Sequence, residues 1–96
     1  MENYIFEWDE AKNQTNIIKH NISFKNAQYA FADINRIIAI DIKHSSDIEK
    51  RYYCIGKLHN DEIVTVRFVL LNHNIRIIGA GYWRQGRKAY EEKNTI

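Results

Sequence analysis

The chain has 96 residues, which suits one small domain and leaves too little material for two independent hydrophobic cores. Hydrophobic residues make up 45% of the sequence and charged residues 27%, a balance that argues against a disordered chain. The formal net charge is only +2, so any case for an anionic partner depends on where the charges lie.

The sequence favours a cytoplasmic protein with a single domain over residues 1–96. Residues 1–9 contain acids and no apolar stretch of the kind found in signal peptides. No run approaches the roughly 20 apolar residues that cross a membrane. Cys54 is the one cysteine and lies in an apolar stretch, so we expect a buried, reduced thiol.

The first third of the chain predicts a short strand followed by two helices. Residues 4–8 (YIFEW) are aromatic and β-branched, as in a strand. Asp9 can cap a helix that runs to about His20, with Asn21 as its stop. Ser23 can begin a second helix that ends around residues 33–35. The second helix has an apolar stripe that we expect in the core: Phe24, Ala27, Gln28 and Phe31.

The rest of the chain predicts four strands and a closing helix. The strand-like runs cover residues 36–42, 50–57, 62–71 and 75–80, and the last three are joined by links of hairpin length. Trp83, Arg87 and Tyr90 follow at helical spacing, with Gly86 as a weak point. The expected order is therefore β-α-α-β-β-β-β-α, an α+β fold with a mainly antiparallel sheet.

Three arginines fall on neighbouring strands. In residues 62–71, Arg67 points away from the better apolar face, while Arg51 and Arg76 begin the flanking strands. A two-residue turn at residues 73–74 would place Arg67 and Arg76 on one face, whereas a three-residue turn would separate them. The arginines could equally form surface ion pairs. The candidate acids for such pairs are Asp41, Asp47, Glu49 and Glu62.

The first helix adds a second group of polar candidates. Lys12, Asn16 and Lys19 share one face, and His20 ends the helix. A histidine there can cap the helix or act as a general base or acid. His44 is expected to make only a local loop contact. No residues have the spacing of a metal site or of a nucleotide-binding glycine loop, so we expect no metal ion or cofactor.

The string IRIIGAGYWRQGRKAYEE near the C-terminus combines glycines, aromatics and cations. Gly79 and Gly81 would permit a bulge or bend. The bend would present aromatic and basic side chains together, a combination that binds RNA by stacking on bases and holding phosphates. The residues concerned are Tyr82, Trp83, Arg84, Arg87 and Lys88. Alternatively, Trp83 and Tyr90 simply pack the closing helix on the sheet.

Several strings together resemble one known family. They are FEWDEAKNQTNIIKHNISFKNA, FADINRI, HSSDIEKRYYCIGK and the closing IRIIGAGYWRQGRKAYEE, in order over residues 6–92. They resemble the BrnT family, the toxins of BrnT–BrnA type II toxin–antitoxin pairs. Many members continue the last strand as R-I-I-S-A-R, where this chain reads RIIGAGYWR.

The resemblance implies a RelE-like fold and a metal-independent ribonuclease that halts translation. It also implies neutralisation by a BrnA-like antitoxin with a ribbon-helix-helix domain, in a toxin–antitoxin heterotetramer that meets DNA only through the antitoxin. Exposed aromatics such as Tyr4 or Tyr52 are candidates for the antitoxin contact, although each can equally belong to the core or to a sheet edge.

RNA can be cut without metal when its 2′-hydroxyl group attacks the adjacent phosphorus, and arginines can stabilise the charged intermediate. We expect Arg51, Arg67 and either Arg76 or Arg84 to hold the phosphate. His20 or Lys12 would move a proton. The residues expected to bind RNA are Lys19, Tyr82, Arg87 and Lys88. Two other readings stay open: a non-catalytic module that binds RNA or a partner, and an inactive toxin kept as a co-repressor.

Overall fold

A computed structural model describes residues 4–95, so the outermost residues of the predicted 1–96 domain lie outside the described part. The elements in chain order are β1 (Ile5–Glu7), α1 (Glu10–His20), α2 (Phe24–Ala27), the 3₁₀ helix η1 (Gln28–Ala32), β2 (Ile37–Ile40), β3 (Arg51–Lys57), β4 (Ile63–Leu71), β5 (Asn74–Gly81) and α3 (Arg84–Lys93). The predicted α+β order is confirmed, and the second predicted helix is an α-helical turn that continues as η1.

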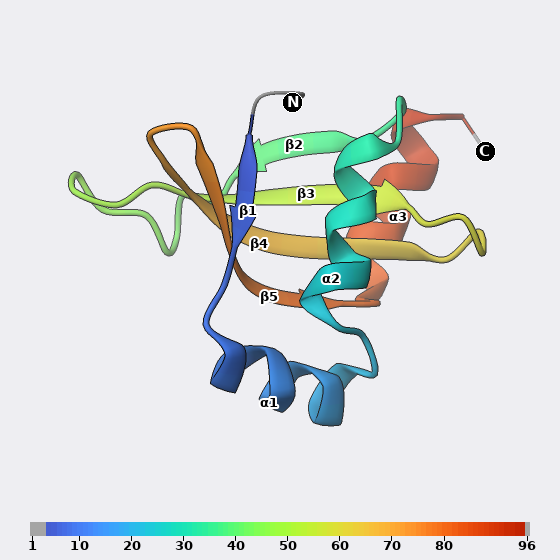
Figure 1. The fold of residues 1–96 in the computed structure, drawn as a ribbon. Helices are drawn as coiled ribbons and strands as arrows, with labels where there is room; N and C mark the ends of the chain where they lie inside the picture. Colours follow the sequence, from blue (N-terminus) through green and yellow to red (C-terminus); the bar gives the residue numbers. More distant parts are fainter. Residues whose placement is uncertain (1–3, 96) are drawn as a thin grey trace.

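The strands form one sheet in the order β1-β5-β4-β3-β2. All neighbours are antiparallel except β1, which runs parallel to β5, so the prediction of a mainly antiparallel sheet is confirmed. In Figure 1, α2 lies over one face of the sheet, α3 lies on the other, and α1 runs beside the β5 end. The sheet therefore presents two faces that pack against different helices.

Local contacts fix both ends of α1 as the sequence predicted. The Asp9 carboxylate accepts a hydrogen bond of 3.1 Å from the Lys12 backbone N–H, which is a standard N-cap. Asn21 ends the helix in the left-handed conformation with φ of 57°. Ser23 caps α2 in the same way as Asp9 caps α1, through a 3.1 Å bond from the Asn26 N–H.

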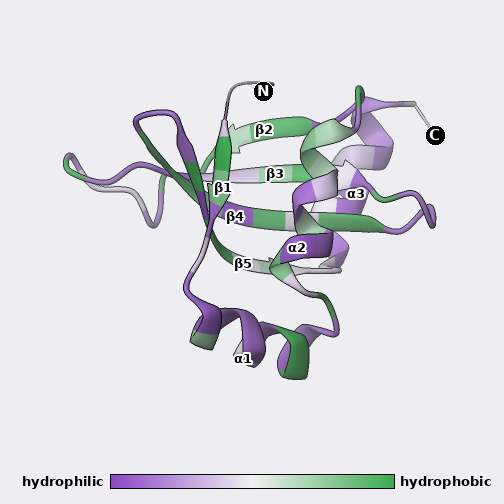
Figure 2. Ribbon diagram, viewed as in Figure 1, coloured by the Kyte–Doolittle hydropathy of each residue, from purple (hydrophilic) through white to green (hydrophobic). Residues whose placement is uncertain are grey.

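The hydrophobic core lies between the sheet and α2 with η1. Phe24, Phe31 and Phe68 form its aromatic centre, with valines and isoleucines of β4 and β5 around them. Cys54 is fully buried there, as predicted, and burial raises the pKa of its thiol to about 12. Figure 2 shows the contrast between the hydrophobic strand segments and the mainly hydrophilic surface of α1. The core thus occupies one face of the sheet and leaves the α3 face for other contacts.

The turn between β4 and β5 differs from both predicted registers. Leu71 pairs with Asn74, so the two-residue turn is Asn72–His73, one position earlier than expected. Asn72 adopts φ of 58°, which asparagine tolerates better than most residues. The pairing places Arg76 opposite Val69 and, after a bulge, Gly79 opposite Arg67. Cross-strand partners share a face, so Arg67 and Arg76 lie on the α3 face together.

Gly86 and Tyr90 form the buried face of α3, and Arg87 lies outside it. Tyr90 is 2% exposed, as expected, but the Arg87 side chain is 68% exposed. The helix approaches the sheet at Gly86 instead, where any Cβ atom would collide with the Thr65 hydroxyl. Gly86 therefore allows close packing of α3 on β4, and this packing turns Arg87 outward.

A partly buried hydrogen bond joins α3 to the loop before β2. The Tyr90 hydroxyl donates to the Asp33 carboxylate over 2.6 Å, and the Lys57 N–H donates to the same oxygen over 2.7 Å. Burial opposes ionisation of Asp33, but these hydrogen bonds outweigh it and hold its pKa below the usual value. Burial, followed by the Asp33 carboxylate, raises the pKa of Tyr90 to about 12. The end of α3 is thereby fixed to β3.

No helix among residues 4–95 combines the length and apolarity needed to cross a membrane.

Candidate functional site

A basic hollow of about 320 Å³ lies where α1 meets the end of β5. We call it the α1 hollow. Its lining residues are Ala11, Lys12, Thr15, Asn16, Lys19, His20, Arg67 and Ile78. No carboxylate of the described residues lines it. The structure therefore brings together four of the predicted site residues, and their combined charge favours an anionic ligand.

Two buried asparagines hold α1 in this position. The Asn16 side chain accepts a hydrogen bond from the Ala80 N–H of β5 over 3.2 Å and donates to the Ile22 carbonyl over 2.9 Å. The Asn13 side chain accepts from the Phe24 N–H over 2.8 Å. Since buried polar groups are costly to leave unpaired, these bonds specify the placement of the helix. The basic face of α1 is therefore fixed against the sheet.

Arg67 is the central cation of the site and has no acidic partner among residues 4–95. None of the ion pairs or side-chain hydrogen bonds within residues 4–95 involves its guanidinium group. Its Nε atom is buried without a hydrogen-bond partner. The guanidinium carbon lies 5.8 Å from the centre of the Trp83 ring, a cation–π contact. An unpaired, partly buried cation of this kind is available to an incoming anion.

Gly79 and Gly81 provide the surface on which Arg67 and Trp83 lie. A Cβ atom at Gly79 would stand 2.7 Å from the Arg67 Nη2 atom, and one at Gly81 would stand 2.7 Å from the Trp83 ring. We expected these glycines to permit a bulge or a bend, and a bulge does lie beside Gly79, at the Arg67/Phe68 step of the pairing, although neither glycine has a positive φ. Their role is to let two large side chains lie close to the backbone.

Trp83 connects the α1 hollow to a second hollow beneath α3. Its ring meets the edge of the His20 ring at a centroid distance of 5.2 Å and an angle of 72°. The second hollow, here called the α3 hollow, has a volume of about 470 Å³. Its lining residues are Tyr53, Ile55, Thr65, Arg67, Trp83, Gln85, Gly86 and Ala89. Arg67 thus forms part of both hollows.

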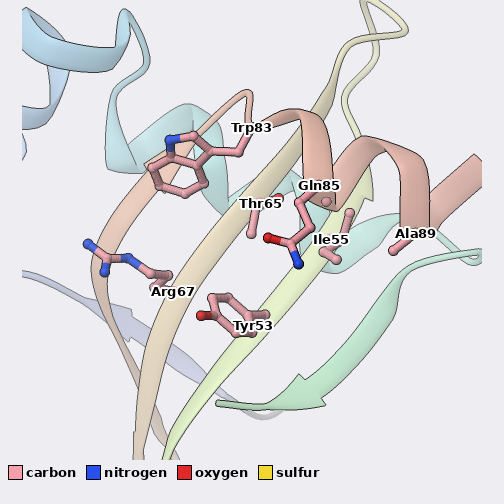
Figure 3. A pocket seen from close by; sticks show the side chains of 8 residues that line it. Tyr53, Ile55, Thr65, Arg67, Trp83, Gln85 and Ala89 are labelled. Carbon is pink, nitrogen blue, oxygen red and sulfur yellow. The ribbon is translucent and has the colours of Figure 1, made fainter. Parts of the chain in front are cut away.

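Figure 3 shows the α3 hollow from close by. Arg67 and Trp83 form one side, Tyr53 lies across from Trp83, and the Gln85 side chain extends from α3 toward Tyr53. Burial, and then the neighbouring Asp41 carboxylate, raise the pKa of the Tyr53 hydroxyl, while Arg67 partly opposes the rise. Tyr53 is consequently a protonated hydroxyl at neutral pH, and its proton is directed to the Asp41 carboxylate.

Asp41 lies at the β2 end of this face and is occupied by local contacts. Its carboxylate lies 2.8 Å from the His44 ring Nδ1 and accepts a 3.2 Å bond from the His44 N–H. Burial would raise the pKa of Asp41, but hydrogen bonds from His44 and Tyr53 outweigh this effect and lower it. The predicted local contact of His44 is confirmed, and Asp41 does not pair with an arginine.

The other two strand arginines are paired with acids. Arg76 Nη1 lies 2.8 Å from a carboxylate oxygen of Glu7 on β1. Hydrogen bonds from Asn74 and then Arg76 lower the pKa of Glu7. Arg51 Nε lies 2.9 Å from Glu49. The ion-pair reading of the sequence therefore describes Arg51 and Arg76 but not Arg67, and neither of the first two lines a hollow.

The remaining predicted residues lie on the outer surface at the start of α3. Tyr82 is 38% exposed, and Arg84 and Lys88 are exposed without lining either hollow. Arg87 pairs with Glu91 over 3.4 Å. These side chains can extend a basic surface next to Trp83, but they do not meet the α1 hollow.

The sequence reasoning missed Tyr53, Gln85 and Thr15, all of which line a hollow. For Tyr53 a signal was available. Strand alternation puts Tyr53 on the same face of β3 as Arg51, and the observed register pairs it directly with Arg67. Gln85 carries no comparable signal, because its position depends on how α3 packs on the sheet.

Within residues 4–95, no three histidine, cysteine, aspartate or glutamate side chains lie close enough together to hold a metal ion. The α1 hollow offers cations and amides, which repel a metal ion or bind it poorly. The groups gathered here can bind an anion and move a proton.

Comparisons with known proteins find a matching family and a solved structure of similar fold. Residues 8–86 match the sequence profile of a family described as the ribonuclease toxin, BrnT, of type II toxin–antitoxin systems. Among solved structures, the chain is similar to the Brucella abortus ribonuclease toxin BrnT, known from a crystal structure at 1.1 Å resolution. The two are 25% identical, with a TM-score of 0.63, over 85% of this chain and 97% of that one. No curated protein sequence gives a significant match.

Proposed function

Because this chain belongs to the BrnT family of ribonuclease toxins from type II toxin–antitoxin systems, we propose that it is an endoribonuclease that cuts RNA without a metal ion and thereby inhibits translation. The observation that carries the proposal is Arg67, an arginine with no acidic partner in a hollow lined by Lys12, Lys19 and His20. The proposed setting is the cytoplasm, where such an enzyme meets RNA.

The proposed reaction is an internal transesterification. The 2′-hydroxyl oxygen forms a bond to the adjacent phosphorus, and the bond from phosphorus to the 5′-oxygen of the next nucleotide breaks. A base removes the proton from the 2′-hydroxyl, and an acid protonates the leaving 5′-oxygen. The products are a 2′,3′-cyclic phosphate and a 5′-hydroxyl end. The step requires no oxidant and no second substrate.

The residues of the α1 hollow fit these needs. Arg67 would hold the phosphate and stabilise the extra charge that develops on its oxygens. His20 or Lys12 would move the proton, and Lys19 would bind the neighbouring backbone. Tyr82, Arg84, Arg87 and Lys88 would extend the RNA path along the outer surface of α3. Because Arg51 and Arg76 already have acidic partners, we assign them at most a minor part in holding the phosphate.

The proposed partner is a BrnA-like antitoxin with a ribbon-helix-helix domain, in a heterotetramer that reaches DNA through that domain. A type II antitoxin is a protein that inactivates its toxin by binding it. We propose a RelE-like ancestry for the fold, in keeping with the sheet and the helix order. Tyr4 and Tyr52 stay candidates for the antitoxin contact, and both pack against the core cluster while remaining only partly buried.

Cleavage in the presence of a chelator tests the proposal. Purified protein is incubated with a defined RNA and excess EDTA, and the ends of the products are identified by mass spectrometry. We expect cleavage with 2′,3′-cyclic phosphate and 5′-hydroxyl ends. Binding of intact RNA without cleavage would instead indicate a non-catalytic module. A protein that binds antitoxin but neither cuts RNA nor slows growth would be an inactive co-repressor.

A further inference from the structure

We propose that the α3 hollow binds a nucleobase of the RNA next to the phosphate held by Arg67. The inference rests on the proposed ribonuclease function and adds a second binding site to it. The main observation behind it is that Arg67 lines both hollows. In addition, Trp83 lies between His20 on one side and the α3 hollow on the other. A nucleotide whose phosphate contacts Arg67 therefore has its base within reach of this hollow.

The walls of the α3 hollow suit a flat, mostly apolar ring with a polar edge. Ile55 and Ala89 provide an apolar surface, and the rings of Trp83 and Tyr53 provide aromatic walls. Its volume of about 470 Å³ falls within the usual range for pockets that bind small organic molecules. Bases that leave a stack are commonly held by aromatic side chains in this manner.

Two polar groups could recognise the edge of the base. The Gln85 amide offers a carbonyl acceptor and an N–H₂ donor, and Figure 3 shows it extending from α3 into the space above Tyr53. The Tyr53 hydroxyl lies on the opposite wall, and because its proton is directed to the Asp41 carboxylate, its oxygen can accept a hydrogen bond from the base. A base edge presents donors and acceptors side by side, so an amide matches it better than a charged group does. We therefore assign Gln85 the role of a residue that determines base preference.

The charge distribution separates this hollow from the phosphate site. Arg67 is the one charged side chain among its lining residues, and it lies at the side shared with the α1 hollow. A phosphate would meet the α1 hollow first, where three further basic side chains line the wall. A neutral base would lose less hydration on entering the α3 hollow than a phosphate would. The two halves of a nucleotide thus fit the two hollows.

The experiment uses RNA substrates from which one base has been removed. The abasic position is moved one nucleotide at a time through the cleavage site, and initial cleavage rates of the full chain are measured. We expect one position next to the scissile phosphate at which base removal slows the wild type by about tenfold to a hundredfold, in keeping with the loss of base stacking. Equal rates at every position would overturn the inference while leaving the ribonuclease proposal intact.

A variant that fills the hollow provides the matched test. Ala89→Leu adds bulk at the wall, and Ala32→Leu adds the same bulk at an exposed position of η1 that lines neither hollow. On intact RNA, Ala89→Leu should be as slow as the wild type is on the abasic substrate, and removing the base should slow it no further. Continued sensitivity of Ala89→Leu to base removal would contradict a base in this hollow. Ala32→Leu should behave like the wild type.

Gln85→Ala supplies a third variant that leaves the aromatic walls unchanged. It should reduce the differences in rate among substrates that carry adenine, guanine, cytosine or uracil at the sensitive position. If these differences persist unchanged, Gln85 does not read the base. If instead Gln85→Ala and Ala89→Leu weaken only antitoxin binding, the hollow accepts a protein side chain and the nucleobase assignment is wrong.

A binding measurement separates this inference from the ribonuclease proposal. A non-cleavable oligonucleotide with a 2′-deoxy position at the cleavage site is titrated into the wild type, and the side-chain amide signals of Gln85 are followed by NMR. A shift that Ala89→Leu abolishes supports the base site even if no RNA is cleaved, in which case only the catalytic proposal fails. Absence of any shift overturns the base site.

Discussion

Three arginines on one face of the sheet differ in their neighbours. Arg76 on β5 lies beside Glu7 of β1 and forms an ion pair with it, and Arg51 on β3 pairs with Glu49. Arg67 lies on the central strand between Tyr53 on one side and Gly79 on the other, and neither neighbour is acidic. The difference shows that residue type alone does not identify a binding arginine. What matters is whether a carboxylate lies beside the arginine, either on an adjacent strand as Glu7 does or in the preceding loop as Glu49 does.

The surroundings of β1 and of α1 show the same contrast between paired and unpaired cations. At the β1 end, an acid on a short parallel strand neutralises the arginine and contributes to joining β1 to β5. At the α1 end, asparagines rather than acids fix the helix against the strand, so the cations of α1 and Arg67 keep their charge for a ligand. The predictions below test this contrast, starting with the largest expected effect.

Arg67→Ala should reduce the rate of RNA cleavage by about 100- to 1,000-fold, because a single donor to a charged transition state commonly contributes that much. The free energy of unfolding should change little, since Arg67 has no ion pair to lose. Initial cleavage rates measured in EDTA test the predicted loss of activity. Unfolding in urea tests the predicted constancy of the free energy of unfolding. A rate within a few-fold of the wild type would remove Arg67 from the phosphate site.

Gly79→Ala should lower cleavage by roughly tenfold to a hundredfold without removing any charge, because small displacements of catalytic groups have effects of that order. The new Cβ atom would stand 2.7 Å from Arg67 Nη2, so the guanidinium group must move. Stability should stay the same or rise slightly, since alanine restricts the unfolded chain more than glycine does. Full activity with unchanged structure would show that the position of Arg67 on Gly79 does not matter.

Tyr90→Phe should lower the free energy of unfolding by about 1.5–3 kcal/mol, the usual range for a hydrogen bond to a charged group. It should leave cleavage nearly unchanged, because Tyr90 lies away from both hollows. Urea unfolding at neutral pH measures the loss. An unchanged unfolding free energy would mean that the bond to Asp33 contributes nothing.

The difference in the free energy of unfolding between the wild type and Tyr90→Phe should depend on pH with a definite sign. The pKa of Tyr90 is raised from 10.0 to about 12, so its contribution is complete below pH 10 and is lost as the pH rises toward 12. The pKa of Asp33 is lowered, so its contribution is lost as the pH falls through that lowered value. The stability difference between the wild type and Tyr90→Phe should therefore be constant near neutrality and shrink above pH 10.

Arg76→Ala should reduce cleavage far less than Arg67→Ala, by less than about tenfold, because surface ion pairs contribute little and this arginine is already occupied by Glu7. Glu7→Gln is the sharper companion variant, since it releases Arg76 without removing it. We expect Glu7→Gln to bind RNA slightly more tightly than the wild type. A large loss of cleavage in Arg76→Ala would contradict the distinction between paired and unpaired arginines.

Local signals in the sequence predicted much of the fold. Asp9, Asn21 and Ser23 act within one helical turn, so their capping roles could be inferred without knowing the tertiary structure. The register of β4 and β5 could not be inferred, because Asn72 and Asn74 suit a turn equally well and the apolar pattern does not reveal the bulge. Side-chain alternation still placed Arg67 on the correct face, since it depends on β4 alone.

Part of the candidate site could likewise be predicted from local sequence patterns, and the rest depends on tertiary contacts. The shared face of Lys12, Asn16 and Lys19 follows from helical spacing, and it lines the α1 hollow. The acid beside Arg76 was missed because Glu7 reaches β5 through a parallel pairing between the two ends of the chain. Gln85 was missed because its place in the α3 hollow depends on the close contact of Gly86 with Thr65, which no local pattern encodes.

The most direct test of the account follows the arginine side chains themselves. Side-chain ¹⁵N NMR spectra are recorded while a non-cleavable RNA analogue with one 2′-deoxy position is titrated into the wild-type protein. We expect the guanidinium signals of Arg67 to shift and sharpen as they bind phosphate, while those of Arg51 and Arg76 stay in place. If the signals of Arg76 or Arg51 shift and those of Arg67 do not, the unpaired arginine is not the phosphate ligand.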